Sequence, residues 1–218
     1  MMHRRFLKVR GSLARLQNHG KSFRIPTRAF SLIELLVVIA IIALLSALAM
    51  PALNSVLQGG QLSQATTQVI STLSYAMQRA TSDNQAVTMR LIAGANGGKY
   101  RYLQLLVRQP DGTFRPLDRL VKLPDTAQIA TVPNLTSFFT RPVQTAGTND
   151  PTLPTLGAGY RFVEFQIRPD GRLGLDVEKK WFITLFAERE DPELSSPPAN
   201  FATIQIDPVN GGITFFRP

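Results

Sequence analysis

The sequence contains no cysteine and only two histidines, His3 and His19, both close to its start. The absence of cysteine excludes disulfide bonds, thiolate nucleophiles and cysteine-ligated metal sites. Removal of the first 29 residues would remove histidine as well, and with it the usual nucleophile–base pairs and zinc ligands. No carboxylate pair at a recognisable catalytic spacing and no phosphate-binding glycine loop replaces them. We therefore expect no enzymatic activity, no catalytic residue, no cofactor and no metal.

Acidic residues are missing from residues 1–29, which carry eight lysines and arginines. The whole chain has a formal net charge of +9, from 24 basic and 15 acidic residues. Without the eight basic residues of this N-terminal leader (1–29), 16 basic residues remain against all 15 acidic residues, so the rest of the chain is nearly neutral. The basic character therefore describes this leader and says little about the partners of the folded part.

Charge is also scarce in the next stretch, where Glu34 is the only charged residue between Phe30 and Gln78. Residues 35–53 are 19 positions of almost unbroken apolar sequence, about long enough to cross a bilayer as a helix. A buried core helix could be equally apolar, but lysine and arginine flank this segment on one side only. That asymmetry predicts a membrane span with residues 1–29 in the cytoplasm. Pro51 predicts a kink near the outer end of the helix.

Beyond the apolar run, the pattern changes from helix to strand. Apolar residues recur every three or four positions from Leu62 to Ala80, which predicts one helix over about 30–83 whose second half is amphipathic. Strand-like segments separated by glycine-containing turns follow at 86–93, 99–108, 114–123, 161–168, 181–187, 203–206 and 213–216. Residues 133–160, rich in proline, threonine and glycine, predict an irregular insertion. Helix first and strands afterwards indicate an α+β fold, with a mostly antiparallel sheet packed on the helix.

The junction Ala29-Phe30-Ser31-Leu32-Ile33-Glu34, followed by the apolar run, resembles the processing site of type IV prepilins and type II secretion pseudopilins. The resemblance implies cleavage between Ala29 and Phe30 by a prepilin peptidase, which also methylates the new amine of Phe30. It also implies that Glu34 pairs with the N-terminal amine of a neighbouring subunit during assembly. An unpaired carboxylate costs roughly 2.5–3.5 kcal/mol at the centre of a membrane helix, which supports a specific role for Glu34. The alternative is that Glu34 lies at the headgroup boundary and reaches water.

Two features complicate this interpretation of the junction. The family has glycine before the cut, whereas this chain has Ala29, the next smallest residue, which predicts slower processing. A rival cut after Ala47-Leu48-Ala49 fits the small-x-small rule of signal peptidase. Pro51 lies unfavourably close to that cut, which would also leave Glu34 unexplained.

Later segments resemble a subgroup of the same family. The run 73–87 and the turns at 168–171 and 206–212 are similar to H-type pseudopilins and FimT-like minor pilins, and to the prepilin-like cassette D proteins of Verrucomicrobia. The implied fold is pilin-like. The expected organisation is a cleaved leader (1–29), a transmembrane and assembly half of the helix (30–53), an amphipathic half (54–84) and a β-rich head (85–218).

The resemblance implies a structural subunit, a minor pseudopilin or pilin of a type II secretion or type IV pilus-like filament. Its expected partners are the prepilin peptidase, other pilins or pseudopilins, and the bacterial inner membrane. The chain would cross that membrane once with its head in the periplasm, and would reach a filament or the cell surface after assembly. The sequence does not distinguish secretion, pilus and DNA-uptake systems.

Two alternatives stay open at this stage. Basic residues group in sequence at 101–122 and 161–180, as a DNA-binding minor pilin of an uptake system would require, although the near-neutral charge after residue 29 does not favour nucleic acid. The other alternative is a plain exported or membrane-anchored β-domain.

Overall fold

A computed structural model describes residues 31–94, 98–187, 190–191 and 194–218, and within its helix the side chains of residues 48–58 lie outside that description. The chain divides into two parts, residues up to Ser46 and residues Ala47–Pro218. The second part holds both β-sheets, and its residues 85–218, which follow helix α1, are called the head below. The leader 1–29 and Phe30 lie outside the described residues.

Helix α1 begins at Leu32 and ends at Ser82, close to the predicted limits of 30 and 83. Its end is a Schellman motif, because the amide of Gln85 donates to the carbonyl of Ala80 and that of Asn84 to the carbonyl of Thr81. Asn84 takes the left-handed conformation that this motif needs, at φ 47°. No helix in the described part of the chain is at once long and apolar enough to cross a membrane.

The described strands form two antiparallel sheets. The first has the order β3-β2-β1-β7-β6, with β4 also pairing with β2. Its strands are β1 (Val87–Ala93), β2 (Tyr100–Arg108), β3 (Phe114–Pro116), β4 (Val121–Lys122), β6 (Gln144–Thr145) and β7 (Arg161–Ile167). The second has the order β10-β9-β8-β5. Its strands are β5 (Ala127–Ile129), β8 (Trp181–Ala187), β9 (Phe201–Ile206) and β10 (Ile213–Phe216).

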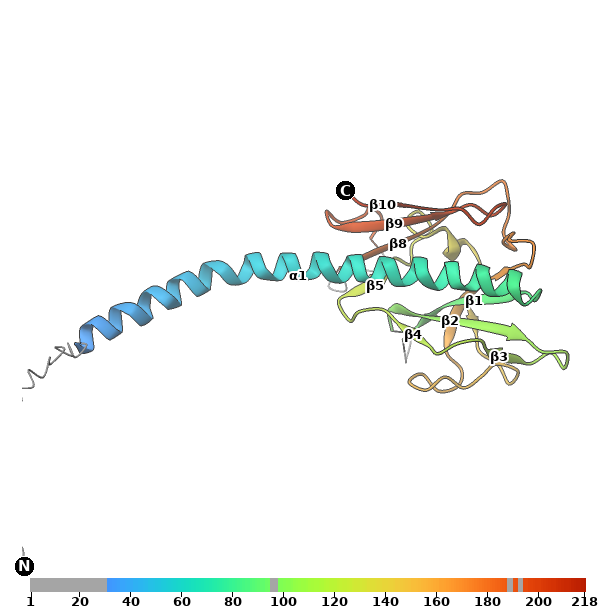
Figure 1. Ribbon diagram of the computed structural model, residues 1–218, viewed down its shortest axis with the longest axis horizontal. Helices are drawn as coiled ribbons and strands as arrows, with labels where there is room; N and C mark the ends of the chain where they lie inside the picture. Colours follow the sequence, from blue (N-terminus) through green and yellow to red (C-terminus); the bar gives the residue numbers. More distant parts are fainter. Residues whose placement is uncertain (1–30, 95–97, 188–189, 192–193) are drawn as a thin grey trace, which may run out of the picture. The chain divides into compact units, whose positions relative to one another are not determined.

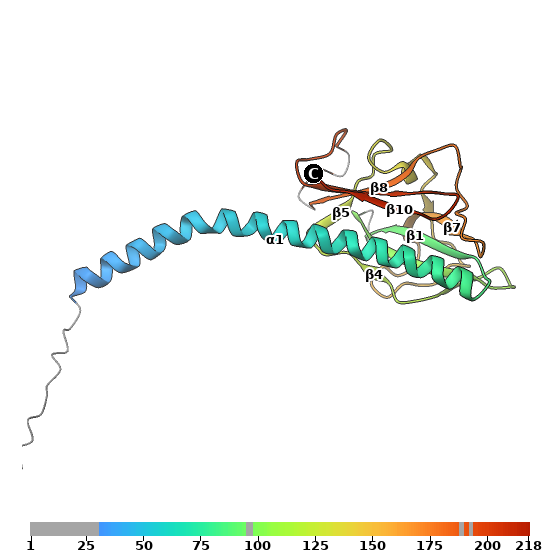
Figure 2. The ribbon, with the colours of Figure 1, turned by 45° about the horizontal axis from the view of Figure 1, so that its top comes forward.

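The main core lies between the C-terminal half of α1 and both sheets. In both views β8 and β10 lie on one side of this half-helix and β4 on the other (Figures 1 and 2). The predicted apolar stripe is confirmed, since its six side chains are at most 2% exposed: Leu62, Ala65, Val69, Leu73, Ala76 and Ala80. Three of the six are alanines, and small side chains allow the helix backbone to approach the strands closely.

The segment 133–160 is more ordered than its composition predicts. It contains a 3₁₀ turn, η2 (Ser137–Thr140), and the short strand β6. Phe138 of η2 is fully buried, with ring centroids 4.8 Å from Phe165 of β7 and 5.2 Å from Trp181 of β8. The hydroxyl of Ser137 accepts a hydrogen bond from the Phe182 amide at 2.8 Å. This part of the segment therefore joins the two sheets.

The α+β class and the antiparallel sheet are confirmed, while one strand prediction is wrong in detail and one strand was not predicted. The predicted strand 114–123 is broken into β3 and β4, both of which pair with β2. Asp118 lies in the break, where its carbonyl accepts a hydrogen bond from the buried amide of Gln104 at 2.7 Å. Strand β5 was not predicted, because its three residues follow Pro124 too closely for a period-two pattern to develop.

Candidate functional site

The N-terminus of α1 is built from a Ser-x-x-Glu sequence. Ser31 precedes the first helical residue, and its hydroxyl accepts a hydrogen bond from the Glu34 amide at 3.2 Å. The Ser31 carbonyl accepts from the amides of Glu34 and Leu35, both at 3.1 Å. The bond from the Glu34 amide to the Ser31 hydroxyl is one of the two hydrogen bonds of a capping box, in which glutamate or glutamine occupies the third helical position. The negative charge of Glu34 also opposes the positive end of the helix dipole.

The Glu34 amide therefore takes part in the helix cap, which the sequence analysis missed. The Ser-x-x-Glu spacing was visible in the sequence and was overlooked beside the resemblance to prepilins. An experiment on Glu34 must separate helix capping from the charge of the carboxylate.

The helix that follows this cap is apolar on every side. Every described side chain from Ser31 to Ala47 is exposed in the single chain. The large apolar residues in this stretch range from 42% exposed at Val38 to 84% at Leu32. A helix that is hydrophobic all round needs an apolar environment, either lipid or other protein.

The other predicted positions are less well described. Ala29 and Phe30 lie outside the described residues. Pro51 lies within the continuous helix α1, while its side chain is outside the description. The cleavage between Ala29 and Phe30 and the kink at Pro51 both stay predictions.

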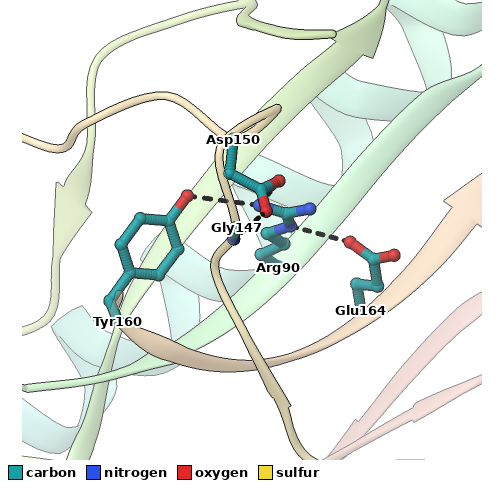
Figure 3. Close-up of polar contacts among 5 residues, drawn as sticks. All are labelled: Arg90, Gly147, Asp150, Tyr160 and Glu164. Atoms are coloured by element: carbon teal, nitrogen blue, oxygen red, sulfur yellow. Dashed lines mark hydrogen bonds and ion pairs between the residues drawn. The ribbon is translucent and has the colours of Figure 1, made fainter. Parts of the chain in front are cut away.

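In the head, the most unusual side chain is Arg90 in the middle of β1, which is 1% exposed (Figure 3). Its Nε donates to a carboxylate oxygen of Glu164 on β7 at 2.7 Å. One terminal nitrogen lies 2.7 Å from the Asp150 carboxylate and donates to the Tyr160 hydroxyl at 3.2 Å. The guanidinium carbon lies 3.7 Å from the centroid of the Phe162 ring. Arg90 thus connects β1 to β7 and to the segment 133–160.

The electrostatics of this cluster keep Arg90 charged. Burial by itself would lower the pKa of Arg90, but hydrogen bonds and charges from Glu164 and Asp150 outweigh it and raise that pKa. Burial raises the pKa of Tyr160, although the neighbouring Arg90 acts in the opposite direction. Asp150 is held in turn by the Gly147 amide, which donates to its second oxygen at 2.7 Å. The arrangement is a buried ion-pair cluster, in which Asp150 Oδ1 faces Arg90 as an ion pair without a hydrogen bond of good geometry.

Members of the two basic groups noted in the sequence have different surroundings. Several members pair with nearby carboxylates: Lys122 lies 2.6 Å from Asp125, and Lys179 lies 3.1 Å from Asp176. Arg108, Arg168 and Arg172 instead line one groove on the head, together with Arg141. Within the described residues no three side chains of the metal-binding kinds gather at one point.

Comparison with known proteins adds one direct finding. Residues 26–50 match the family model of the prokaryotic N-terminal methylation motif. No curated protein matches the chain. Among solved structures, it is similar to the minor pseudopilin EpsH of the type 2 secretion system of Vibrio cholerae, at 10% identity and a TM-score of 0.42 over 72% of this chain and 98% of that one. It is also similar to the type IV minor pilin FimU of Pseudomonas aeruginosa, at 12% identity and a TM-score of 0.42 over 73% and 93% of the two chains.

The methylation motif spans the junction at Phe30, Glu34 and the apolar start of α1. Together with a long N-terminal helix followed by an antiparallel head, it supports the assignment of this chain as type IV pilin-like. This assignment rests on the motif and on the chain's own architecture, because the two structural likenesses are too distant to carry it.

Proposed function

We propose that the protein is a minor subunit of a type II secretion or type IV pilus-like filament. A prepilin peptidase cuts between Ala29 and Phe30 and methylates the new amine of Phe30. Residues 30–53 then anchor the protein in the bacterial inner membrane by a single pass, with the head in the periplasm. On assembly this helix leaves the lipid and packs against the helices of other pilins or pseudopilins. The protein acts through these contacts and catalyses no reaction.

The observation that carries the proposal is the N-terminal part of α1. A matched methylation motif leads directly into a capped helix whose apolar side chains are exposed all round. Lipid supplies the apolar environment before assembly, and neighbouring helices supply it afterwards. Glu34 is costly in the lipid core, and the positive amine of a neighbour's Phe30 offsets that cost.

The first test is the N-terminus of the mature protein, measured by mass spectrometry on material from the membrane fraction. We expect N-methylated Phe30. The substitution Ala29→Gly should speed the conversion, because it restores the residue that the family has before the cut. An N-terminus at Met50 would mean cleavage by signal peptidase, and an intact leader would mean a plain membrane anchor. Either result would overturn the proposal.

The second test separates the charge of Glu34 from its role in the cap. Glu34→Gln keeps a side chain that suits the third position of a capping box but removes the negative charge. Ser31→Ala removes the capping hydroxyl and leaves the charge in place. We expect Glu34→Gln to abolish incorporation into filaments, measured by cross-linking to neighbouring subunits, while Ser31→Ala incorporates nearly as well as the wild type. Normal incorporation of Glu34→Gln would refute the charge pairing.

A further inference from the structure

A groove of about 630 Å³ lies on the head, on the face of the first sheet that carries Thr88 and Glu164. Arg108 lines it from the end of β2, and Arg168 from the residue after β7. Arg141 follows η2, and Arg172 belongs to the turn beyond β7. The sequence alone gave no sign of Arg141, because it lies far along the chain from the two basic groups.

The groove carries positive charge that the described part of the chain does not neutralise. Among the described residues, Arg108, Arg141 and Arg168 form no ion pair, and Arg172 lies 3.9 Å from a carboxylate oxygen of Asp170. The acidic side chain of the groove lining is Glu164, which already pairs with Arg90 at 2.7 Å. Guanidinium groups match carboxylates in planar, bidentate geometry. The charge therefore favours an anionic ligand.

The spacing of two arginines fits an extended chain. Val107 of β2 and Ile167 of β7 both pair with Val87 of β1. Arg108 and Arg168 come directly after these two residues, so they lie at the same level of the sheet. Two strand spacings place their backbones about 10 Å apart. Side chains on one face of an extended peptide repeat every ~6.8 Å, a distance that two long arginine side chains can match. Carboxylates at alternate positions would reach both guanidinium groups.

The remaining lining favours a peptide over a nucleic acid. Val177 and Val209 are 64% and 50% exposed, and they offer apolar contacts that a phosphate backbone would not use. A single-stranded nucleic acid would need free aromatic faces for base stacking. Phe165 is buried at 2% exposure, and Phe114 has the Arg90 guanidinium 4.8 Å from its ring centroid.

From this arrangement we infer that the groove binds an extended acidic peptide segment of a partner protein, with carboxylates and apolar side chains alternating along it. Arg108 and Arg168 hold successive carboxylates, Arg141 and Arg172 add positive charge, and Val177 and Val209 contact the apolar side chains. The site belongs to the head and does not depend on cleavage at Phe30, so its test is independent of the filament assignment.

The test uses the full chain purified in detergent and a labelled peptide of alternating glutamate and valine, with binding followed by fluorescence anisotropy. We expect saturable binding that weakens as salt rises, and much weaker binding of the counterpart in which glutamine replaces glutamate. The double variant Arg108→Gln/Arg168→Gln should lose at least about tenfold in affinity. Arg115→Gln/Arg119→Gln removes the same charge from residues outside the groove and should keep nearly wild-type affinity.

Four results would overturn the inference. An equal loss of affinity in the control double variant would mean that the overall positive charge of the protein attracts the peptide. Equal binding of the glutamine peptide would mean that the groove does not recognise carboxylates. Tighter binding of a single-stranded or duplex oligonucleotide, lost in the same groove variant, would assign the groove to nucleic acid. Absence of peptide binding at a protein concentration of about 1 mM would mean that the groove is not a peptide-binding site. Unchanged circular dichroism of both double variants would exclude misfolding as the cause of any loss.

Discussion

The buried Arg90 cluster allows a quantitative prediction. Asp150→Asn and Glu164→Gln each replace a carboxylate by a neutral amide of similar size, while the Arg90 side chain stays 2% exposed and charged. Each single change should lower the free energy of unfolding by about 1.5–3 kcal/mol, the usual value of a hydrogen bond to a charged group. The double change leaves a buried guanidinium without a countercharge, and about 3–5 kcal/mol is expected. That loss is a large part of the ~5–15 kcal/mol that stabilises an ordinary domain.

Trp181 provides the assay. It is the only tryptophan of the chain, it is 3% exposed, and its indole N–H donates to the Asp176 carbonyl at 2.8 Å. Its fluorescence should therefore report unfolding of the head in urea, and linear extrapolation gives the free energy. Asp170→Asn and Glu178→Gln make the same chemical changes at exposed positions and should stay within about 0.5 kcal/mol of the wild type.

A further variant distinguishes an unpaired charge from the mere loss of contacts. Adding Arg90→Met to the double variant removes the buried charge, and an apolar replacement of a buried ion pair is often close to neutral. We expect this triple variant to be more stable than the double variant. If the triple variant is no more stable, or if the double variant lies within about 1 kcal/mol of the wild type, the reasoning is refuted.

Three further predictions concern other polar groups. Tyr100 has a buried hydroxyl with no hydrogen-bond partner among the described residues, so Tyr100→Phe should leave the free energy of unfolding unchanged or raise it. Tyr160→Phe loses the hydrogen bond from Arg90 and should lower the free energy of unfolding in urea by about 1 kcal/mol. Burial raises the pKa of both tyrosines, so stability should fall as the pH rises above about 10, and Tyr100→Phe should reduce that fall in parallel urea titrations. Arg217 donates to the Gly59 carbonyl of α1 at 3.2 Å, so Arg217→Met should speed hydrogen exchange around Gly59 and leave β1 unchanged.

The sequence predicted the architecture well where a periodic pattern was long. The spacing from Leu62 to Ala80 predicted the buried face of α1, and alternating residues around glycine turns predicted β1, β2, β7 and β8. The division of the strands between two sheets was not predicted, because pairing partners such as β5 and β8 lie far apart in the chain. A pattern within one strand carries no information about such a distant partner.

The candidate site was predicted unevenly for the same reason. Glu34 was recognised from a local motif, although its part in the helix cap was missed. Arg90 was not singled out from the sequence, and its partners Asp150 and Glu164 lie 60 and 74 positions further along the chain. The grouping of Arg108 and Arg168 depends equally on the pairing of β1 with β2 and β7, which three-dimensional structure alone supplies.

The place of β1 at the centre of its sheet has a consequence for the newly made chain. Its hairpin partner β2 follows at once, but β7 is synthesised about 70 residues later, so one edge of β1 stays open in the meantime. An open edge invites pairing with other chains, and a charged side chain on it discourages such pairing. We therefore expect Arg90 to protect the nascent head from aggregation before Glu164 arrives. The triple variant that replaces Arg90 by methionine should then aggregate more than the wild type on rapid refolding.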